Sequence, residues 1–323
     1  MSLKRITIKH FETQSGYTYK HLVLSYQVFG DQKNLTNNAV LVCHALTGNS
    51  HVAGENGWWN TLIGAHKTID TTSYPVIAFN IPGNGFSGND GIIEDYKHLT
   101  TYDIAKLFTY GLETLGVQKL HSVIGGSLGG MIVWEFAAHF SSWAEHFLPI
   151  ATDYKSSNWV IGQNKVQEHI IENCEHGIAI ARELAMLFYR TPQDFKRKFF
   201  RSWNEEKKCS NVESYLKYQG KKLEKRMHPT AYKTMTHLLS ACSVAETKGA
   251  FVSLFQRFTG HIHIVGISSD ILFPAYECRE AFEALDFAGV SCSYNEIESD
   301  YGHDAFLIEF EQLHEIIKNI YKR

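Results

Sequence analysis

The sequence has 323 residues, enough for one large α/β domain with an insertion or for two smaller domains. Apolar residues make up 44% and charged residues 20%, which is typical of a soluble globular enzyme and excludes a disordered chain. The formal net charge is −3 and no dense run of Lys and Arg occurs, so we expect no nucleic-acid partner.

The six cysteines are scattered along the chain and include no Cys-x-x-Cys pair. Free thiols in a reducing compartment explain this pattern better than a disulfide framework does. The N-terminal residues Met1 to His10 contain no apolar run of the kind that a secretory signal needs. No apolar run approaches the length of a membrane span either. We therefore expect a cytoplasmic protein without a membrane partner.

The first half of the chain has the patterns of a sheet. Segments Ile6 to His10 and Leu22 to Phe29 alternate apolar and polar residues, as an antiparallel edge does. Between two later apolar runs, Tyr102 to Leu115 has apolar residues at helical spacing. Strands that alternate with helices predict a mostly parallel sheet with helices on both faces. The short apolar runs are Ala39 to Cys43, Pro75 to Phe79 and Leu120 to Ile124.

The pattern changes at about Lys155 and stays changed to Gly260. Strand patterns vanish there, and helical, charged stretches such as Ile178 to Tyr189 and Asn211 to Met227 replace them. Strand patterns return later, and the chain closes with an amphipathic helix. We predict an α/β core made of residues 1–154 and 261–323, interrupted by a helical lid domain at 155–260. The later elements are the strands His261 to Ile267 and Ser291 to Ile297, and the helix that begins at about Phe306.

Gly125 to Gly129 has the Gly-x-Ser-x-Gly spacing. It directly follows the apolar run that ends at Ile124 and directly precedes the helix-like run Gly130 to Phe140. A nucleophilic serine needs this strand–turn–helix context, and glycines let neighbouring backbone approach closely. The helix behind the serine favours developing negative charge. The alternative, a glycine-rich turn with an incidental serine, leaves the flanks unexplained, so we predict that Ser127 is a nucleophile.

Two later residues complete a catalytic triad in the order Ser, Asp, His. Asp270 and His303 each follow a predicted strand, in what we expect to be loops. The carboxyl ends of parallel strands are where ligand sites gather. We expect His303 to remove the Ser127 proton and Asp270 to orient and stabilise the imidazole.

An oxyanion needs preorganised N–H donors. We expect one from Leu128, the residue after the nucleophile, and one from Leu46, in the loop His44 to Gly48 that follows an apolar run.

Two other patterns carry less weight. Gly83 to Gly88 fits Gly-x-Gly-x-x-Gly, but a nucleotide site would need a helix there, and Asn89-Asp90-Gly91 continues the loop. His261 and His263 alternate on one strand, yet no Cys, Asp or Glu stands at a partnering spacing. We expect structural histidines and no metal.

Several stretches along the chain together resemble the homoserine O-acetyltransferases of the α/β-hydrolase superfamily. Those at His44 to Gly48 and Glu213 to Leu216 are much more specific than the serine motif alone. The resemblance implies an α/β-hydrolase fold with a helical lid insertion. The stretches are Cys43 to His51, Gly57 to Trp59, Leu62 to Gly64, Ile69 to Thr71, Gly125 to Met131, Glu213 to Leu216, Tyr218 to Lys221, Ser268 to Asp270 and Gly302 to Leu307.

The resemblance implies transfer of an acetyl group from acetyl-CoA to Ser127 and then to the hydroxyl of L-homoserine, on the way to methionine. It implies that Asp304 binds the substrate amine and an arginine of the lid binds the carboxylate; Arg190 is the match. A solvated arginine at a helix end is the alternative for Arg190. The resemblance also implies a homodimer formed through the lid, and acetyl-CoA as a substrate with no tightly bound cofactor.

Three places depart from the family pattern: the loop Ile81 to Asn89, Ile132, and Arg226 to His228. The loop is closer to those of esterases. Three alternatives therefore stay open: an acyltransferase that uses L-serine or succinyl-CoA, a carboxylic ester or thioester hydrolase, and a non-catalytic binding protein, which the intact triad disfavours.

Overall fold

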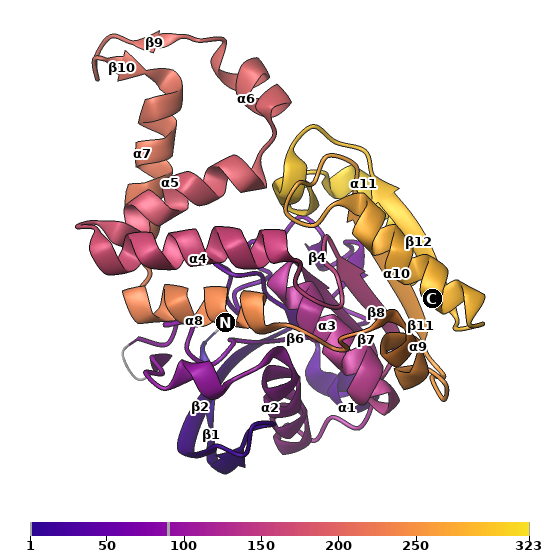
Figure 1. Ribbon diagram of the computed structural model, residues 1–323. Coiled ribbons are helices and arrows are strands. Elements are labelled where there is room, and N and C mark those ends of the chain that lie inside the picture. The colour runs from indigo at the N-terminus through magenta and orange to yellow at the C-terminus, as the bar shows by residue number, and fades with distance from the viewer. Residues whose placement is uncertain (1, 89–90, 323) are drawn as a thin grey trace.

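The computed structural model describes residues 2–88 and 91–322. Its centre is an eight-stranded sheet in the order β1-β2-β6-β3-β7-β8-β11-β12 (Figure 1). The strands β1 and β2 pair antiparallel, β2 also runs antiparallel to β6, and the other pairs are parallel. The bounds are β1 (Lys4–Glu12), β2 (Thr18–Phe29), β3 (Ala39–Cys43), β6 (Val76–Phe79), β7 (Leu120–Gly126), β8 (Ala144–Ile150), β11 (His261–Ile267) and β12 (Cys292–Ile297).

This architecture confirms the predicted mostly parallel sheet with an antiparallel edge. Every residue of β3 is buried, because the strand is covered on both faces. Its side chains alternate between two buried clusters: Leu41 belongs to one cluster, and Val40 and Val42 to the other.

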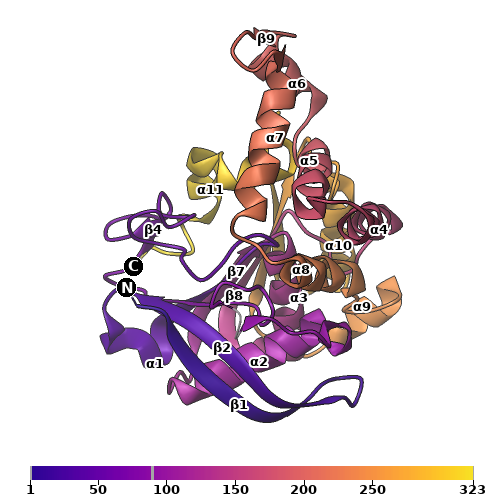
Figure 2. The ribbon, with the colours of Figure 1, turned by 90° about the vertical axis from the view of Figure 1, so that its left-hand side faces the viewer.

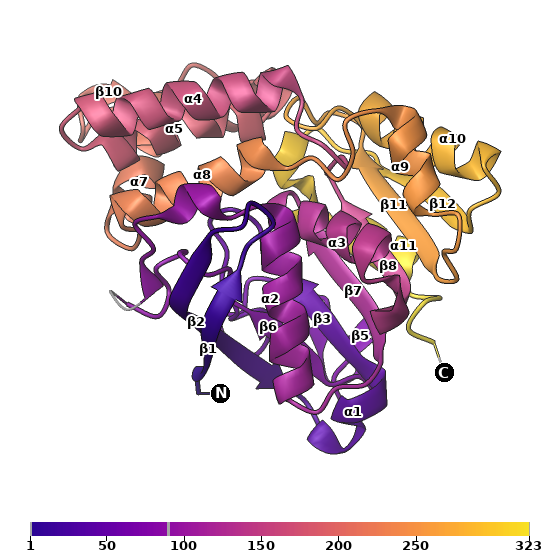
Figure 3. The same ribbon diagram turned by 60° about the horizontal axis from the view of Figure 1, so that its bottom comes forward.

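Helices cover one face, and the C-terminal helix with irregular segments covers the other. The first cluster includes Phe108 of α2, Trp134 of α3 and Leu285 of α10, and Figure 3 shows α2 and α3 in front of the strands. The second includes Trp59 and Ile317 of α11. The bounds are α1 (Leu35–Asn38), α2 (Thr101–Thr114), α3 (Leu128–His139), α10 (Ala275–Phe287) and α11 (Phe310–Ile317), with β4 (Ile63–Gly64) and β5 (Ile69–Asp70) in the irregular segments.

Helices also fill the interval between β8 and β11. There α4 packs on α5 and α8, and α5 packs on α7. The segment 192–224, which we call the arm, projects from the rest of the lid (Figures 1 and 2). The division into core and lid domains stays a prediction. The bounds are α4 (Asn158–Asn173), α5 (Gly177–Tyr189), α6 (Pro192–Phe199), β9 (Trp203–Asn204), β10 (Cys209–Ser210), α7 (Asn211–Glu224), α8 (Pro229–Ala241) and α9 (Lys248–Leu254).

Two local features differ from the sequence prediction. The helix after the serine begins at Leu128 rather than Gly130, so one residue separates it from β7. His303 lies in a 3-10 helix, η5 (Gly302–Leu307), rather than in an irregular loop. Within residues 2–88 and 91–322, no helix is long and apolar enough to cross a membrane.

Candidate active site

Ser127 is the single residue between β7 and α3. Its φ of 57° and ψ of −126° lie in a region that non-glycine residues rarely adopt. Its N–H donates to the carbonyl of Ile150 at the end of β8 (2.9 Å), and its carbonyl accepts from Met131 N in the first turn of α3 (3.1 Å). The strained backbone is therefore held from both sides.

The glycines around Ser127 are required by close packing. A Cβ on Gly129 would lie 2.2 Å from the carbonyl oxygen of Cys43, and a Cβ on Gly125 would lie 2.6 Å from Gly129. A Cβ on Gly126 would lie 2.5 Å from the ring of Phe306. The tight turn thus brings the serine against the end of β3 on one side and against η5 on the other.

Asp270 and His303 are in direct contact. The Nδ1 of His303 lies 2.7 Å from Asp270 Oδ2, and both side chains are buried. The other carboxylate oxygen, Oδ1, accepts from the backbone N–H of Leu272 (2.7 Å) and Phe273 (3.0 Å). These bonds fix the carboxylate, which in turn fixes the orientation of the imidazole and the tautomer that protonates Nδ1.

The environment of His303 favours its charged form. Burial alone lowers the pKa of His303, but the charge and hydrogen bond of Asp270, with the charge of Asp304, outweigh burial and raise the pKa above its ordinary value.

The Phe306 ring, which packs against the serine turn, lies 5.7 Å from the His303 ring. The structure therefore brings Ser127, Asp270 and His303 to one end of the parallel strands.

The two predicted oxyanion donors lie on adjacent segments. Leu128 is the first residue of α3, where N–H groups lack partners inside the helix. Leu46 lies in a turn closed by a bond from Gly48 N to Ala45 O (2.8 Å). A Cβ on Gly129 would also lie 3.0 Å from the carbonyl oxygen of His44, so the turn abuts the start of α3.

His44 supports this turn. Its Nε2 accepts from Ile81 N (2.9 Å), and its Nδ1 lies 2.8 Å from Ala45 O. Burial lowers the pKa of His44 to about 4, against a smaller opposing effect of the Ala45 hydrogen bond. A neutral ring that donates from Nδ1 and accepts at Nε2 fits both contacts.

Arg190 and Asp304, predicted to bind opposite ends of a substrate, bind each other. The Nε of Arg190 donates to Asp304 Oδ2 (2.9 Å), and its Nη1 donates to Asp194 Oδ2 (3.1 Å). Burial alone lowers the pKa of Arg190, but Asp304 outweighs burial and raises it. Arg190 is therefore a paired residue beside His303, and the solvated helix-end alternative is wrong.

A second arginine, Arg182, was missed by sequence reasoning. Its guanidinium lies 5.2 Å from the centre of the Tyr189 ring, which lies 5.8 Å from the His303 ring. Within the described part of the chain, Arg182 forms no ion pair. It shares a helical face with Ile178, Ala185 and Tyr189. A lone charge on an apolar helical face was the available signal.

The two histidines of β11 have ordinary hydrogen-bond partners. His261 and His263 hydrogen-bond to Ser291 and Ser293. Among residues 2–88 and 91–322, no group of three or more His, Cys, Asp or Glu could hold a metal ion. The glycine loop is formed of turns up to Gly88, and Asn89 and Asp90 lie outside the described residues.

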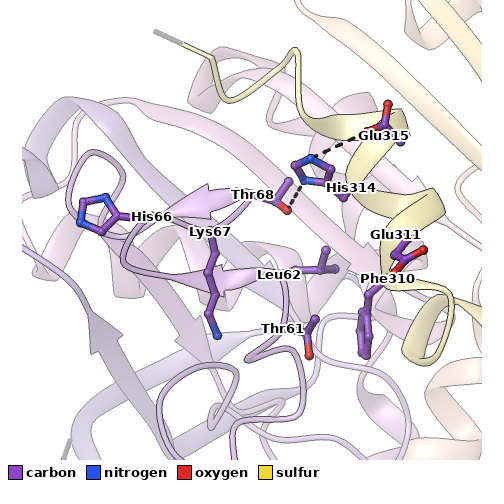
Figure 4. A pocket seen from close by; sticks show the side chains of 9 residues that line it. All are labelled: Thr61, Leu62, His66, Lys67, Thr68, Phe310, Glu311, His314 and Glu315. Carbon is purple, nitrogen blue, oxygen red and sulfur yellow. Dashed lines mark hydrogen bonds and ion pairs between the residues drawn. The ribbon is translucent and has the colours of Figure 1, made fainter.

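A surface hollow of about 600 Å³ lies between the β4–β5 segment and α11 (Figure 4). His314 faces Thr68 across it, with His314 Nδ1 and Thr68 Oγ1 2.7 Å apart. None of the predicted triad residues lines this hollow, so it is separate from the candidate site.

Known proteins agree with this fold. Residues 38–310 match the family model described as the alpha/beta hydrolase fold, and the chain belongs to that family. Within it, the chain is 34% identical to the homoserine O-acetyltransferase of Nautilia profundicola, over 96% of this chain and 95% of the relative. It is 33% identical to that of Moorella thermoacetica, over 96% and 92%. The chain is therefore an enzyme of the homoserine O-acetyltransferase family.

Solved structures extend the fold comparison. The homoserine O-acetyltransferase from Bacillus anthracis superposes with a TM-score of 0.88 at 18% identity, covering 100% of this chain and 98% of that one. Esterase E22 superposes with a TM-score of 0.86 at 19% identity, covering 99% and 100%. Because an esterase and a transferase fit about equally well, the fold does not distinguish hydrolysis from transfer.

Proposed function

We propose that this enzyme moves an acetyl group from acetyl-CoA to the hydroxyl of L-homoserine through an acyl-enzyme on Ser127. The position of Asp304 is the observation that supports an amino acid as the acceptor. This carboxylate follows His303 directly in the chain and lies close to arginine side chains. A zwitterionic acceptor needs a negative group and a positive group of the protein, one for its ammonium and one for its carboxylate, close to the base that deprotonates its hydroxyl.

The chemistry has two balanced halves. His303 takes the Ser127 proton as the oxygen attacks the thioester carbonyl; the thiolate of CoA leaves and takes that proton from the imidazolium. The acceptor hydroxyl then gives its proton to His303 as it attacks the acetyl-serine ester, and Ser127 regains a proton when the new ester leaves. In both halves the N–H groups of Leu46 and Leu128 stabilise the tetrahedral oxyanion.

Asp304 and one arginine are proposed to hold the acceptor. Asp304 would take the ammonium group. Arg190 already has two carboxylate partners, whereas Arg182 has none in the described chain. We therefore revise the earlier assignment: Arg190 orients Asp304, and Arg182 binds the substrate carboxylate. Transfer outcompetes hydrolysis where the acceptor is held in line and water is excluded.

Paired variants separate the two arginines. We expect Arg182→Ala to raise the KM for L-homoserine at least about tenfold, through loss of a charge-assisted contact, and to leave CoA release without acceptor unchanged. Arg190→Ala should slow both halves, because it frees Asp304 beside His303. An unchanged homoserine KM in Arg182→Ala would return the carboxylate to Arg190.

Thiol release from acetyl-CoA, measured with L-homoserine, L-serine or no acceptor, tests the acceptor. We expect rapid release only with L-homoserine, and no comparable rate with succinyl-CoA. Release at full rate in water alone would favour the second candidate, an ester or thioester hydrolase, which the likeness to esterase E22 supports.

We also propose a homodimer formed through the lid. Large apolar side chains are exposed on the arm, including Phe200 (77% exposed) and Trp203 (56%). A hollow of about 610 Å³ is lined by Phe200. Apolar exposure on this scale marks contact surfaces. A reducing cytoplasm fits the six free cysteines.

A further inference from the structure

The outer face of α7 has a groove of about 470 Å³. Its lining residues on α7 recur three and four positions apart, so they share one helical face. The opposite face packs on α5, where a Cβ on Gly220 would lie 2.6 Å from the carbonyl oxygen of Ala179. The lining residues are Lys207, Cys209, Ser214, Lys217, Tyr218, Lys221, Lys222 and Lys225.

The groove carries more positive charge than its carboxylate partners balance. Lys217 pairs with Glu213 (2.6 Å), and Lys207 donates to the hydroxyl of Ser214 (2.9 Å). In the part of the chain that the structure describes, no carboxylate pairs with the lysines at 207, 221, 222 and 225. A concentration of positive charge in a chain of net charge −3 attracts a polyanion.

An aromatic ring accompanies the lysines. Tyr218 is 57% exposed and lines the same groove, with Lys222 Nζ 6.0 Å from the centre of its ring. Exposed aromatic rings are stacking platforms for nucleic-acid bases, and such sites combine stacking with positive charge along the phosphates. The pairing of Tyr218 with the lysines therefore fits a nucleotide better than it fits a simple anion.

The groove leads toward the catalytic residues. It ends at Lys225, whose neighbour Arg226 donates through Nη1 to Thr47 O (3.0 Å). Thr47 follows Leu46, a proposed oxyanion donor. The lysines extend back along α7 from Lys225 to Lys217, over about 12 Å at the helical rise of 1.5 Å per residue. Figure 2 shows α7 running from the arm tip down toward the rest of the molecule.

We propose that this groove binds the 3′-phosphorylated ADP end of the acyl-CoA donor, with the phosphates on the lysines and the adenine on Tyr218. The proposal rests on the proposed use of an acyl-CoA. A second copy of the chain is a poorer occupant, because two copies of this face would oppose lysines to lysines.

A truncated donor tests the proposal. We expect the triple variant Lys221→Gln, Lys222→Gln, Lys225→Gln to raise the KM for acetyl-CoA at least about tenfold with kcat nearly unchanged. Its KM for S-acetyl-N-acetylcysteamine, which has the same thioester and no nucleotide, should stay unchanged. The control variant Lys4→Gln, Lys9→Gln, Lys20→Gln removes the same charge from β1 and β2 and should leave both KM values as they are. An equal rise for both donors, or no rise, would overturn the proposal.

Direct binding separates this proposal from the proposed function. Calorimetry with adenosine 3′,5′-bisphosphate should detect binding to the wild type, weakening with salt, and at least about tenfold weaker binding to the triple variant and to Tyr218→Ala. Equal binding of inorganic pyrophosphate would overturn the nucleotide assignment, as would no binding of the bisphosphate. If the wild type binds the bisphosphate but does not cleave acetyl-CoA, the proposed function fails and the groove assignment stands.

Discussion

Two carboxylates with different roles act on the imidazole of His303. Asp270 accepts its Nδ1 proton in a fixed, buried contact, whereas Asp304 acts from the next residue and is itself bound by Arg190. Both raise the pKa of His303. The carboxylate of Asp304, which is proposed to bind the ammonium group of the acceptor, thus also raises the pKa of the catalytic base His303.

This coupling predicts the pH dependence of acylation. His303 must be neutral to take the Ser127 proton, and its pKa is raised above the ordinary value of 6.5. The rate of CoA release without acceptor should therefore fall as the pH drops, with a midpoint above pH 6.5. Asp304→Asn removes one raising charge, so the midpoint should move to lower pH.

A pH profile of single-turnover CoA release measures this. The control is Asp300→Asn, which removes a nearby carboxylate that pairs with Arg197 and does not act on His303. A midpoint that Asp304→Asn leaves in place would refute the coupling.

At the scale of elements, some strands could be predicted from the sequence and others could not. The buried runs of β3, β6 and β7 stood out because both faces are covered. Strand β8 did not: Glu145 and His146 make its first half polar and Pro149 interrupts its second. The two-residue strands β9 and β10 are too short to have a pattern.

The candidate site, too, could be predicted from the sequence only in part. Asp270 and His303 were found because each follows a strand. The pairing of Arg190 with Asp304 and Asp194 is tertiary, so no local pattern indicates it.

A row of histidines crosses three adjacent strands. The rings of His121 and His146 lie 5.2 Å apart, and His146 Nδ1 lies 3.1 Å from His263 Nε2. Burial, with neighbouring imidazoles, lowers the pKa of His121 to about 4 and that of His263 to about 3. Burial also lowers the pKa of His146; the charge of Glu145 opposes this effect, and His261 adds to it.

The row predicts an acid-sensitive sheet. The unfolded chain binds protons at these histidines below about pH 6.5, whereas in the folded chain His121 binds a proton only near pH 4 and His263 only near pH 3. These histidines therefore make the free energy of unfolding decrease as the pH falls through that interval. His263→Gln should make this decrease shallower, as measured by urea unfolding at a series of pH values. His21→Gln, on the antiparallel edge, is the control; an unchanged slope in His263→Gln would contradict this account.

At the scale of the whole molecule, one arm has two proposed contact surfaces. The apolar side with Phe200 and Trp203 suits a second copy of the chain, and the lysine groove on α7 suits an anion. We expect Phe200→Ser with Trp203→Ser to convert a dimer to a monomer in sedimentation measurements. Phe287→Ser, at a 96% exposed position on α10, should leave the dimer intact. A wild type that sediments as a monomer would refute the dimer.

The covalent intermediate is the central claim, and mass spectrometry of the intact protein tests it most directly. After incubation with acetyl-CoA and no acceptor, we predict one added acetyl group, located on the peptide that contains Ser127. Addition of L-homoserine should remove it and give O-acetyl-L-homoserine. Turnover by Ser127→Ala at the wild-type rate, or an acetyl group on another residue, would contradict the account.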